Sequence, residues 1–523
     1  MATADERASA LASANESRFV LLLRNTFFNT LRAFSSSAVT VLIPIFLVVV
    51  LEPRRYAVWA LIFSLGSFVA YFDLGLPTTA QALVGRAVSV KKMRDARNTV
   101  ASGLAIILLV SGICVLASVL AALGFNLIFP SVPKSLNGEG QWGLILIVIG
   151  QASILTGNVV SSYFSGQQRS HVAALILSPG RILSLVCAVV AAAATRDLVT
   201  IALGYAAPLF VATGILVLRF RVEAKRNAPE PATNSHAVGW RGLLRYSGPL
   251  MVWSICMLVT TGLDLIIVAH VDYQAVVSYS IAAIVVSAVA GLQSAATGPL
   301  LPELARAHTL LGPARVSRLA ERFNLVNGTL LFGVTAVLLV AGPLFLPILA
   351  HESSSMSLSK SWLILAVLLV GNAFHLAGTP LSLTFIATQT HSKVIVPPVV
   401  EAALNLVLSL VLGIALGAIG VAIGTLLASA VGILLGYFWS VRVSGVLETA
   451  SIRLLWEGVL RPFACVIPAL IGAIWVVGSG HEVTSGNIFG LLAGAICSMS
   501  LLWFAGLPAK VRVQIGSRLR RHR

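Results

Sequence analysis

The sequence contains few charged residues for its length. Only 11% of its 523 residues are Asp, Glu, Lys or Arg, whereas 57% are hydrophobic and the mean hydropathy is +0.93. Soluble domains carry roughly 25% charged residues, so this composition excludes a soluble fold. Apolar stretches of about 20 residues, the length that crosses the hydrocarbon core as a helix, recur from Phe27 almost to the C-terminus. We therefore expect an all-α integral membrane protein.

The sequence also lacks the motifs of several enzyme classes. None of its seven lysines belongs to a G-x-x-x-x-G-K-[ST] phosphate loop, and there is no H-E-x-x-H zinc motif. Its six aspartates form no D-x-D pair that could hold the metal of a nucleotide sugar, and its five cysteines lack metal-ligand spacing. These absences argue against an enzyme and indicate neither a cofactor nor a metal site.

Hydropathy, with Gly, Pro and charged residues as boundaries, predicts fourteen membrane-spanning helices. We expect them at about 27–50, 57–84, 98–122, 143–165, 172–194, 198–219, 242–269, 274–302, 323–350, 361–386, 394–414, 417–440, 456–477 and 486–506. The predicted divisions are a cytoplasmic N-terminal segment 1–26, a first six-helix bundle 27–219, a cytoplasmic linker 220–241, a second six-helix bundle 242–440, spans 13 and 14 within 441–506, and a basic cytoplasmic tail 507–523.

Membrane topology explains the net charge of +17 better than a nucleic-acid partner does. The basic residues are scattered over short loops and form no aromatic-interleaved patch, which argues against nucleic-acid binding. With the N-terminus inside, 28 of the 36 basic residues fall in inner segments and 5 in outer loops. Cytoplasmic loops carry such an excess of Lys and Arg. We expect a multi-pass protein of the bacterial inner membrane with both termini in the cytoplasm.

An internal repeat relates the two predicted bundles. Many transporters consist of two related bundles around a central site. At a constant offset of 221 residues, small and amide residues match in pairs: Gly150 and Gly371, Gln151 and Asn372, Gly157 and Gly378, and Gln168 and Gln389. Because six spans return the chain to the same side, we expect two parallel bundles around a central cavity, with spans 13 and 14 outside the repeat.

Ionisable residues within the spans are the candidate site residues, because a charge in hydrocarbon is costly. Arg181 lies about nine residues into its span, or roughly 13 Å from the cytoplasmic end. It could hold a phosphate or pyrophosphate, or it could belong to a structural ion pair. Glu401 lies close to the repeat equivalent of Arg181. The two could pair when no substrate is bound, or Glu401 could titrate and couple transport to protons.

Asp73 lies between Phe72 and Leu74 in a segment whose Gly and Pro predict a weakened helix. Its carboxylate could bind the freed backbone groups or line a cavity. Arg32 and Arg461 lie near cytoplasmic span ends, where snorkelling into the headgroups competes with a place at the mouth of a cavity.

Several uncharged or weakly basic side chains within the spans could hydrogen-bond a sugar or join helices to one another. They are Gln151, Asn158, Gln293, Asn372, His375 and Asn405.

Two segments of the first half resemble the signature of polysaccharide and O-antigen repeat-unit flippases, a family of the multidrug/oligosaccharidyl-lipid/polysaccharide (MOP) exporter superfamily. They are Tyr56-Ala57-Val58-Trp59-Ala60-Leu61 and Tyr71-Phe72-Asp73-Leu74-Gly75-Leu76. The second half is similar to the start of that family's second bundle in Gly248-Pro249, Leu263-Asp264-Leu265-Ile266-Ile267, Tyr279-Ser280-Ile281-Ala282, Pro299 and Pro302. The similarity runs over spans 1 to 12.

The resemblance implies a transporter whose cavity opens alternately to each side and carries an undecaprenyl-pyrophosphate-linked oligosaccharide to the outer leaflet. This lipid-linked oligosaccharide, the membrane lipids, and a polymerase and glycosyltransferases of the same O-antigen, capsule or exopolysaccharide pathway are the partners it implies. It also gives the role of cavity cation to Arg181. The alternatives are a multidrug or toxin antiporter of the same fold, a lipid II flippase, and a non-transporting membrane scaffold. The sequence identifies no coupling ion.

The charge asymmetry predicts the sidedness of the chain. Reporter fusions after Arg523 and in the 123–142 loop should report opposite sides of the membrane, because Lys and Arg are concentrated in the segments assigned to the cytoplasm. Paired alkaline phosphatase and fluorescent protein fusions measure this directly. The same side for both fusions would exclude the topology.

Overall fold

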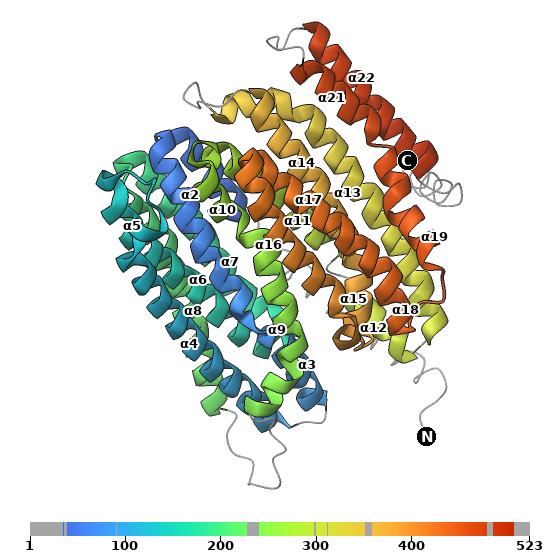
Figure 1. The fold of residues 1–523 in the computed structure, drawn as a ribbon. Coiled ribbons are helices and arrows are strands. Elements are labelled where there is room, and N and C mark those ends of the chain that lie inside the picture. Colours follow the sequence, from blue (N-terminus) through green and yellow to red (C-terminus); the bar gives the residue numbers. More distant parts are fainter. Residues whose placement is uncertain are drawn as a thin grey trace, which may run out of the picture. The chain divides into compact units, whose positions relative to one another are not determined.

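A computed structural model describes residues 35, 39–89, 92–226, 240–297, 300–310, 312–350, 358–478 and 485–506. These residues are almost entirely helical and contain no strand, so the predicted all-α fold is confirmed (Figure 1).

After a short helix, Val39–Val50, the first half contains α2 (Pro53–Ser67), η1 (Phe68–Asp73), α3 (Leu76–Ser89), α4 (Met93–Leu123), α5 (Phe125–Ile128), η2 (Lys134–Leu136), α6 (Asn137–Gly166), α7 (Ser170–Thr195) and α8 (Leu198–Arg226). The second half contains α9 (Trp240–Gly262), α10 (Asp264–Val271), η3 (Tyr273–Ala275), α11 (Val276–Thr297), α12 (Leu300–Leu310), α13 (Pro313–Ala350), α14 (Leu358–Ala377), α15 (Thr379–Ala387), η4 (His391–Val394), α16 (Val396–Leu416), α17 (Ala418–Leu435), η5 (Gly436–Ser440) and α18 (Val441–Ser444). The C-terminal part contains α19 (Ser451–Leu455), η6 (Trp456–Leu460), α20 (Arg461–Ala464), α21 (Ile467–Gly478), α22 (Ser485–Leu501) and η7 (Leu502–Gly506).

Thirteen helical segments of the described chain are long and apolar enough to cross a membrane. In chain order, they correspond one to one to the predicted spans from 57–84 onward. Of the first predicted span, 27–50, the structure describes residue 35 and the short apolar helix Val39–Val50. The rest of that span, with Arg32, lies outside the described residues.

Several predicted spans differ from the observed helices. Within the span predicted at 274–302, α11 is described as far as Thr297, and α12, which begins at Leu300, packs on α13 and α15. The span predicted at 323–350 begins already at Pro313, whose fixed φ suits the first turn of a helix. The span predicted at 242–269 divides into α9 and α10. The prediction placed helix ends by hydropathy, which does not register breaks inside an apolar segment.

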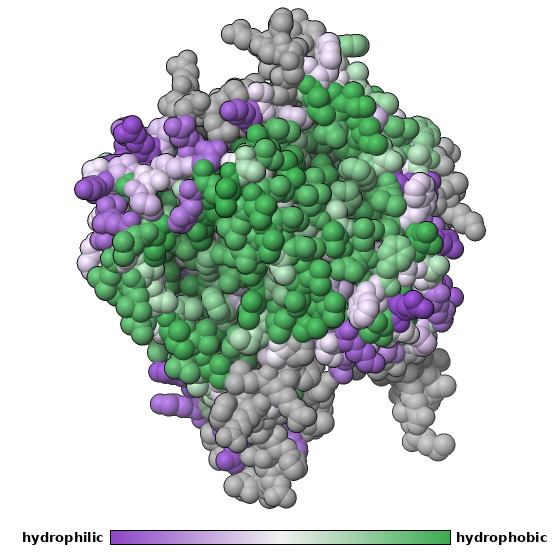
Figure 2. Space-filling model, in the orientation of Figure 1, coloured by the Kyte–Doolittle hydropathy of each residue, from purple (hydrophilic) through white to green (hydrophobic). Residues whose placement is uncertain are grey.

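Large hydrophobic side chains are exposed along the helices, as expected for a protein in lipid. Leu109 of α4, Ile182 of α7, Phe210 of α8 and Phe489 of α22 are among them. On the face shown in Figure 2, hydrophobic side chains cover the central part and hydrophilic ones gather near the margins. A soluble monomer rarely exposes so large an apolar surface, whereas a bilayer covers it.

The chain divides into two compact units. The first contains 1–43, 66–128 and 137–254, and the second contains 44–65, 129–136 and 255–523. The second unit therefore includes most of α2, and the first unit extends into α9. The predicted boundaries of the two six-helix bundles stay a prediction.

The 221-residue offset recurs in backbone geometry. Gln168 and Gln389 both have a left-handed φ, +58° and +59°. The next amide in each case donates to the carbonyl five residues earlier: Arg169 N to Phe164 O at 2.7 Å, and Thr390 N to Phe385 O at 2.9 Å. Both helices thus end in a Schellman cap, with Gln where glycine is usual.

Helix packing follows the same offset. A Cβ on Gly150 of α6 would lie 3.0 Å from the Tyr205 ring of α8. A Cβ on Gly371 of α14 would lie 3.1 Å from Leu426 of α17. Tyr205 and Leu426 are themselves 221 residues apart. The α6–α8 and α14–α17 pairs therefore pack in the same register, which supports the repeat over these spans.

The C-terminal helices are joined to α13 by a close backbone crossing. A Cβ on Gly328 of α13 would overlap the carbonyl oxygen of Gly458 in η6. One turn earlier on α13, Asn324 Nδ2 donates to Leu454 O at 2.9 Å, and Asn324 Oδ1 accepts from the Tyr437 hydroxyl. Small residues and interhelical hydrogen bonds are the means by which helices associate in lipid. The paired helices α21 and α22 also pack against α13 (Figure 1).

This crossing predicts the effect of a single methyl group. Gly328→Ala should destabilise the protein by about 1–3 kcal/mol, because the methyl forces the two backbones apart. Gly214→Ala on α8 is the matched control, since nothing lies within 4 Å of its added Cβ. Thermal unfolding in detergent should show a lower midpoint for Gly328→Ala only. Equal midpoints for both variants would show that the crossing does not limit stability.

Candidate functional site

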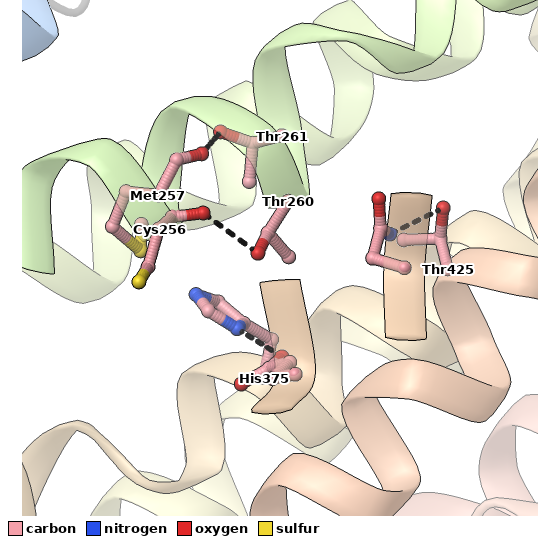
Figure 3. Close-up of polar contacts among 8 residues, drawn as sticks. Cys256, Met257, Thr260, Thr261, His375 and Thr425 are labelled. Carbon is pink, nitrogen blue, oxygen red and sulfur yellow. Dashed lines mark hydrogen bonds and ion pairs between the residues drawn. The ribbon is translucent and has the colours of Figure 1, made fainter. Parts of the chain in front are cut away.

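A histidine and a glutamate from different helices meet within the second unit. His375 lies in the last turn of α14, and Glu401 lies on α16. His375 Nδ1 and Glu401 Oε1 are 2.7 Å apart, and the two side chains are only 16% and 11% exposed. The His375 ring points toward Cys256 and Thr260 of α9 (Figure 3). We call His375 and Glu401 the acid–base pair.

Local sequence explains the position of both side chains. Helix α14 ends at Ala377, because Gly378 and the Thr379-Pro380 start of α15 interrupt it, so His375 falls in a helix C-terminal turn. The carboxylate of Glu401 lies against Gly432 of α17, where a Cβ would overlap Oε2. Glycine at this position leaves the space that the carboxylate occupies.

A hydrogen-bonded cluster begins one helical turn further along α16. Asn405 Nδ2 donates to Thr425 Oγ1 of α17 at 3.1 Å, as drawn in Figure 3. Thr425 Oγ1 donates to Asp264 Oδ2 of α10 at 2.9 Å, and the Tyr279 hydroxyl of α11 donates to the same oxygen at 3.1 Å. Two helices, α11 and α17, therefore direct hydroxyl groups to the buried Asp264 carboxylate, and Asn405 of α16 binds the second of these hydroxyls.

Two oxygen atoms of this cluster have no hydrogen-bond partner in the described part of the chain. They are Asp264 Oδ1 and Asn405 Oδ1, both of which are buried. Such oxygens can accept a proton or coordinate a hard cation. No group of three or more His, Cys, Asp and Glu side chains that could hold a metal ion occurs in the described ranges.

Arg181, a buried cation of the first unit, has buried serines close to it on the same helix. Arg181 is buried in α7, and its charge acts on the buried Tyr205 hydroxyl of α8. Ser178 and Ser184 lie three residues before and after Arg181, on the same side of the helix, and are buried. Their hydroxyls have no hydrogen-bond partner among the residues described. A guanidinium between two such hydroxyls can donate to a phosphate oxygen from several sides.

The predicted pairing of Arg181 with Glu401 stays a prediction, because the two residues belong to different compact units. The partner that the structure gives Glu401 is His375. From the sequence, His375 is expected only as one of the hydrogen-bonding side chains, so this pair is not predicted. Its position just before the Gly378-Thr379-Pro380 break was the available signal, because a broken membrane helix is where an ionisable residue finds polar partners.

Asp73 has the structural role that was one of its two predicted roles. Its Oδ1 accepts the Gly75 N–H at 2.9 Å and lies 3.5 Å from the donating Ser254 hydroxyl. Leu74 and Gly75 have φ values of +54° and +65°, so the helix breaks between η1 and α3. Asp73 therefore binds a backbone group that this break frees from the helix.

The remaining predicted residues lie on separate elements. Gln151 is buried on α6, and Asn372 lies at the repeat-equivalent position on α14 with Nδ2 buried and without a hydrogen-bond partner in the described chain. Arg461 is half-buried at the start of α20. Asp73, Gln151 and Arg181 belong to the first unit, and Asn372, Glu401 and Arg461 to the second, so a common site stays a prediction.

Known structures share this fold, although no protein-family model and no curated protein matches the chain. The structure of the lipid II flippase MurJ in an inward closed conformation is 14% identical and covers 91% of this chain and 97% of its own, with a TM-score of 0.65. The structure of an inward-facing multidrug resistance MATE family transporter of the MOP superfamily is 16% identical and covers 78% of this chain and 95% of its own, with a TM-score of 0.60. A MOP superfamily transporter from Pyrococcus furiosus Vc1, described as having a binding pocket of reversed polarity, is 15% identical. Its structure covers 82% of this chain and 96% of its own, with a TM-score of 0.58.

The chain has the fold of the MOP superfamily transporters. These identities are too low to transfer a substrate. The shared structures confirm the superfamily fold that the sequence motifs implied. They do not test the resemblance to the flippase family.

The helix break at Asp73 predicts two different outcomes for two substitutions. Asp73→Asn keeps an oxygen acceptor for the Gly75 amide and should leave stability near that of the wild type. Asp73→Ala leaves this amide without its side-chain partner and should cost about 0.5–2 kcal/mol, the range for loss of a helix cap. Thermal unfolding of both variants in detergent distinguishes them, and equal losses would mean that the hydrogen bond to Gly75 is not what Asp73 contributes.

Proposed function

We propose that the protein is a membrane transporter that flips a polyprenyl-pyrophosphate-linked oligosaccharide across the inner membrane for polysaccharide biosynthesis. The observation that carries this proposal is the buried group of Arg181, Ser178 and Ser184 on α7. A guanidinium at this depth, close along its helix to two hydroxyls without a described partner, can donate charge-assisted hydrogen bonds to an anion. The pyrophosphate of a lipid-linked sugar is such an anion.

The chemistry of the substrate explains why a protein is needed. Sugar hydroxyls and a pyrophosphate lose their water on entering hydrocarbon, whereas the polyprenyl chain stays in the lipid. A transporter for this molecule needs polar and basic groups within its helices. Arg181 supplies the charge, and amides such as Gln151 and Asn372 supply the type of group that hydrogen-bonds a sugar.

The fold supports transport, and the MurJ comparison makes a lipid II flippase the second candidate. MurJ covers 91% of this chain, whereas the MATE transporter covers 78%. Lipid II carries the same pyrophosphate chemistry, so Arg181 fits both candidates. A multidrug antiporter for organic cations has less support, because the group on α7 presents a positive charge and hydroxyl donors.

The role of Arg181 predicts a graded loss of binding. Arg181→Ala removes one charge-assisted contact, which is worth about 1.5–3 kcal/mol, so affinity for undecaprenyl pyrophosphate should fall roughly ten- to a hundredfold. Arg181→Lys keeps the charge but loses the planar guanidinium, so its affinity should lie between those of the wild type and Arg181→Ala. Arg196→Ala, at the exposed end of α7, is the matched control and should bind like the wild type. Binding is measured by native mass spectrometry of the full chain in detergent.

A reconstituted transport assay separates the candidate functions. Proteoliposomes receive a fluorescent polyprenyl-pyrophosphate oligosaccharide, lipid II or an organic cation, and a membrane-impermeant quencher reports arrival in the opposite leaflet. We expect flipping of the oligosaccharide lipid and its loss in Arg181→Ala. Flipping of lipid II alone would replace the proposal with the second candidate, and transport of the cation alone would reject both.

A further inference from the structure

We propose that His375 and Glu401 form a binding site for a single proton that is exchanged during transport. Proton binding follows from the geometry of the acid–base pair itself. Its coupling to transport rests on the proposed function. The two parts are therefore tested by separate measurements.

The short distance between His375 Nδ1 and Glu401 Oε1 requires one proton between the two atoms. With one proton between His375 Nδ1 and Glu401 Oε1, the pair is either imidazolium with carboxylate or imidazole with carboxylic acid. Both arrangements have no net charge, and both keep the 2.7 Å hydrogen bond. Removing the proton leaves a net negative charge, and adding a second one leaves a net positive charge and no acceptor between the two atoms. Either change is costly in a buried position.

Helix α14 favours the charged arrangement. His375 lies in its last turn, where the carbonyl ends of the helix attract a positive charge. Opposing this, burial favours the uncharged arrangement. Transfer between them breaks the Nδ1–H bond and forms the Oε1–H bond, so only the proton moves and no electron is exchanged.

Few other ionisable groups surround the pair. Three of the helices packed against α14 or α16, namely α15, α17 and α21, contain no ionisable residue. Helices α10 and α11 contribute Asp264 and Tyr279, which are bound to one another, and η5 contributes Tyr437, which is bound to Asn324. His270 of α10 is bonded to the Ile266 carbonyl.

The charged residues of the other neighbouring elements lie near helix ends or have partners of their own. In α13, Arg315, Arg318, Glu321 and Arg322 all lie near its start, and Glu321 accepts from Ser317 and Thr449. Glu457 of η6 is paired with Arg453. From α9, Cys256 is near enough for the charge of Glu401 to act on its thiol. The pair and Asp264, whose Oδ1 can also accept a proton, are therefore the groups whose net charge changes when a proton enters or leaves this region.

The ring orientation provides an exchange partner. The His375 ring points toward Thr260, whose hydroxyl donates to the Cys256 carbonyl at 2.9 Å (Figure 3). The hydroxyl hydrogen is thus engaged, and the oxygen presents its lone pairs for an N–H donor. A proton on the outer ring nitrogen would be stabilised there before release to water.

Gly432 allows the pair to be broken without changing a charge. A Cβ at this position overlaps the Glu401 carboxylate, so Gly432→Ala displaces the carboxylate from His375. Gly436→Ala, one turn further along the chain, adds the same methyl where nothing lies within 4 Å. Both variants add one methyl group to the protein, but only Gly432→Ala disturbs the contact between His375 and Glu401. The double variant His375→Gln/Glu401→Gln keeps a hydrogen bond between neutral side chains and serves where a single substitution fails to fold.

Proton binding is tested by pH-difference infrared spectroscopy of the full chain in detergent, without substrate. We expect a carboxyl band that titrates in the wild type and in Gly436→Ala. This band should be absent from Glu401→Gln and from the double variant, and displaced in Gly432→Ala. A wild-type band that persists unchanged in Glu401→Gln, or no titrating band between pH 4 and pH 9, overturns the proposal.

Coupling is tested in proteoliposomes with the fluorescent polyprenyl-pyrophosphate oligosaccharide and an imposed pH gradient. If one proton is exchanged per substrate, a gradient of one pH unit should change the leaflet distribution by about tenfold. In the double variant the leaflet distribution should no longer respond to the gradient. A wild-type distribution that ignores the gradient overturns coupling, whereas no flipping at all by the wild type rejects the proposed function and leaves the infrared result standing.

Discussion

The absence of water from the bilayer core is the constraint on which this structure depends. A polar group in hydrocarbon has to find its partner within the chain, because no solvent can replace one. The structure meets this demand at a helix break, where Asp73 binds the Gly75 amide, and at a helix crossing, where Asn324 joins α13 to the C-terminal helices. The polar atoms that remain without a described partner, such as the Ser178 hydroxyl and Asp264 Oδ1, stand out for the same reason.

Much of the fold could be predicted from sequence, because apolar length and the distribution of Lys and Arg report directly on the bilayer. The thirteen candidate spans follow the predicted order, and the offset that relates Gln168 to Gln389 recurs in the backbone. The division of α9 from α10 was missed, since hydropathy averages over a break at a single apolar residue, Leu263. Within the site, the burial of Arg181 was predictable from its depth. The contact of Glu401 with His375 was not, because it depends on which faces of α14 and α16 meet and on the space at Gly432.

The repeat shows how one scaffold accommodates different charges. Glu401 of α16 occupies the position of Gly180 in α7. In the first half the glycine lies on α7 itself, and a Cβ on Gly180 would overlap Ala212 of α8. In the second half the glycine lies on the partner helix, as Gly432 of α17, and the carboxylate fills the space. Moving the small residue from one helix to its neighbour thus changes an apolar contact into an acidic one while the packing of the helices is kept.

The crossing of Gly328 with Gly458 has a mechanical consequence. Because the two backbones touch and Asn324 binds across them, α13 cannot tilt without displacing η6. Helices α21 and α22 pack along α13 as well, and their outer side chains, Trp475 and Phe489 among them, are exposed. The paired helices α21 and α22 therefore add lipid-facing area to α13. A tilt of α13 has to move this added area through the lipid, so membrane viscosity would slow the tilt.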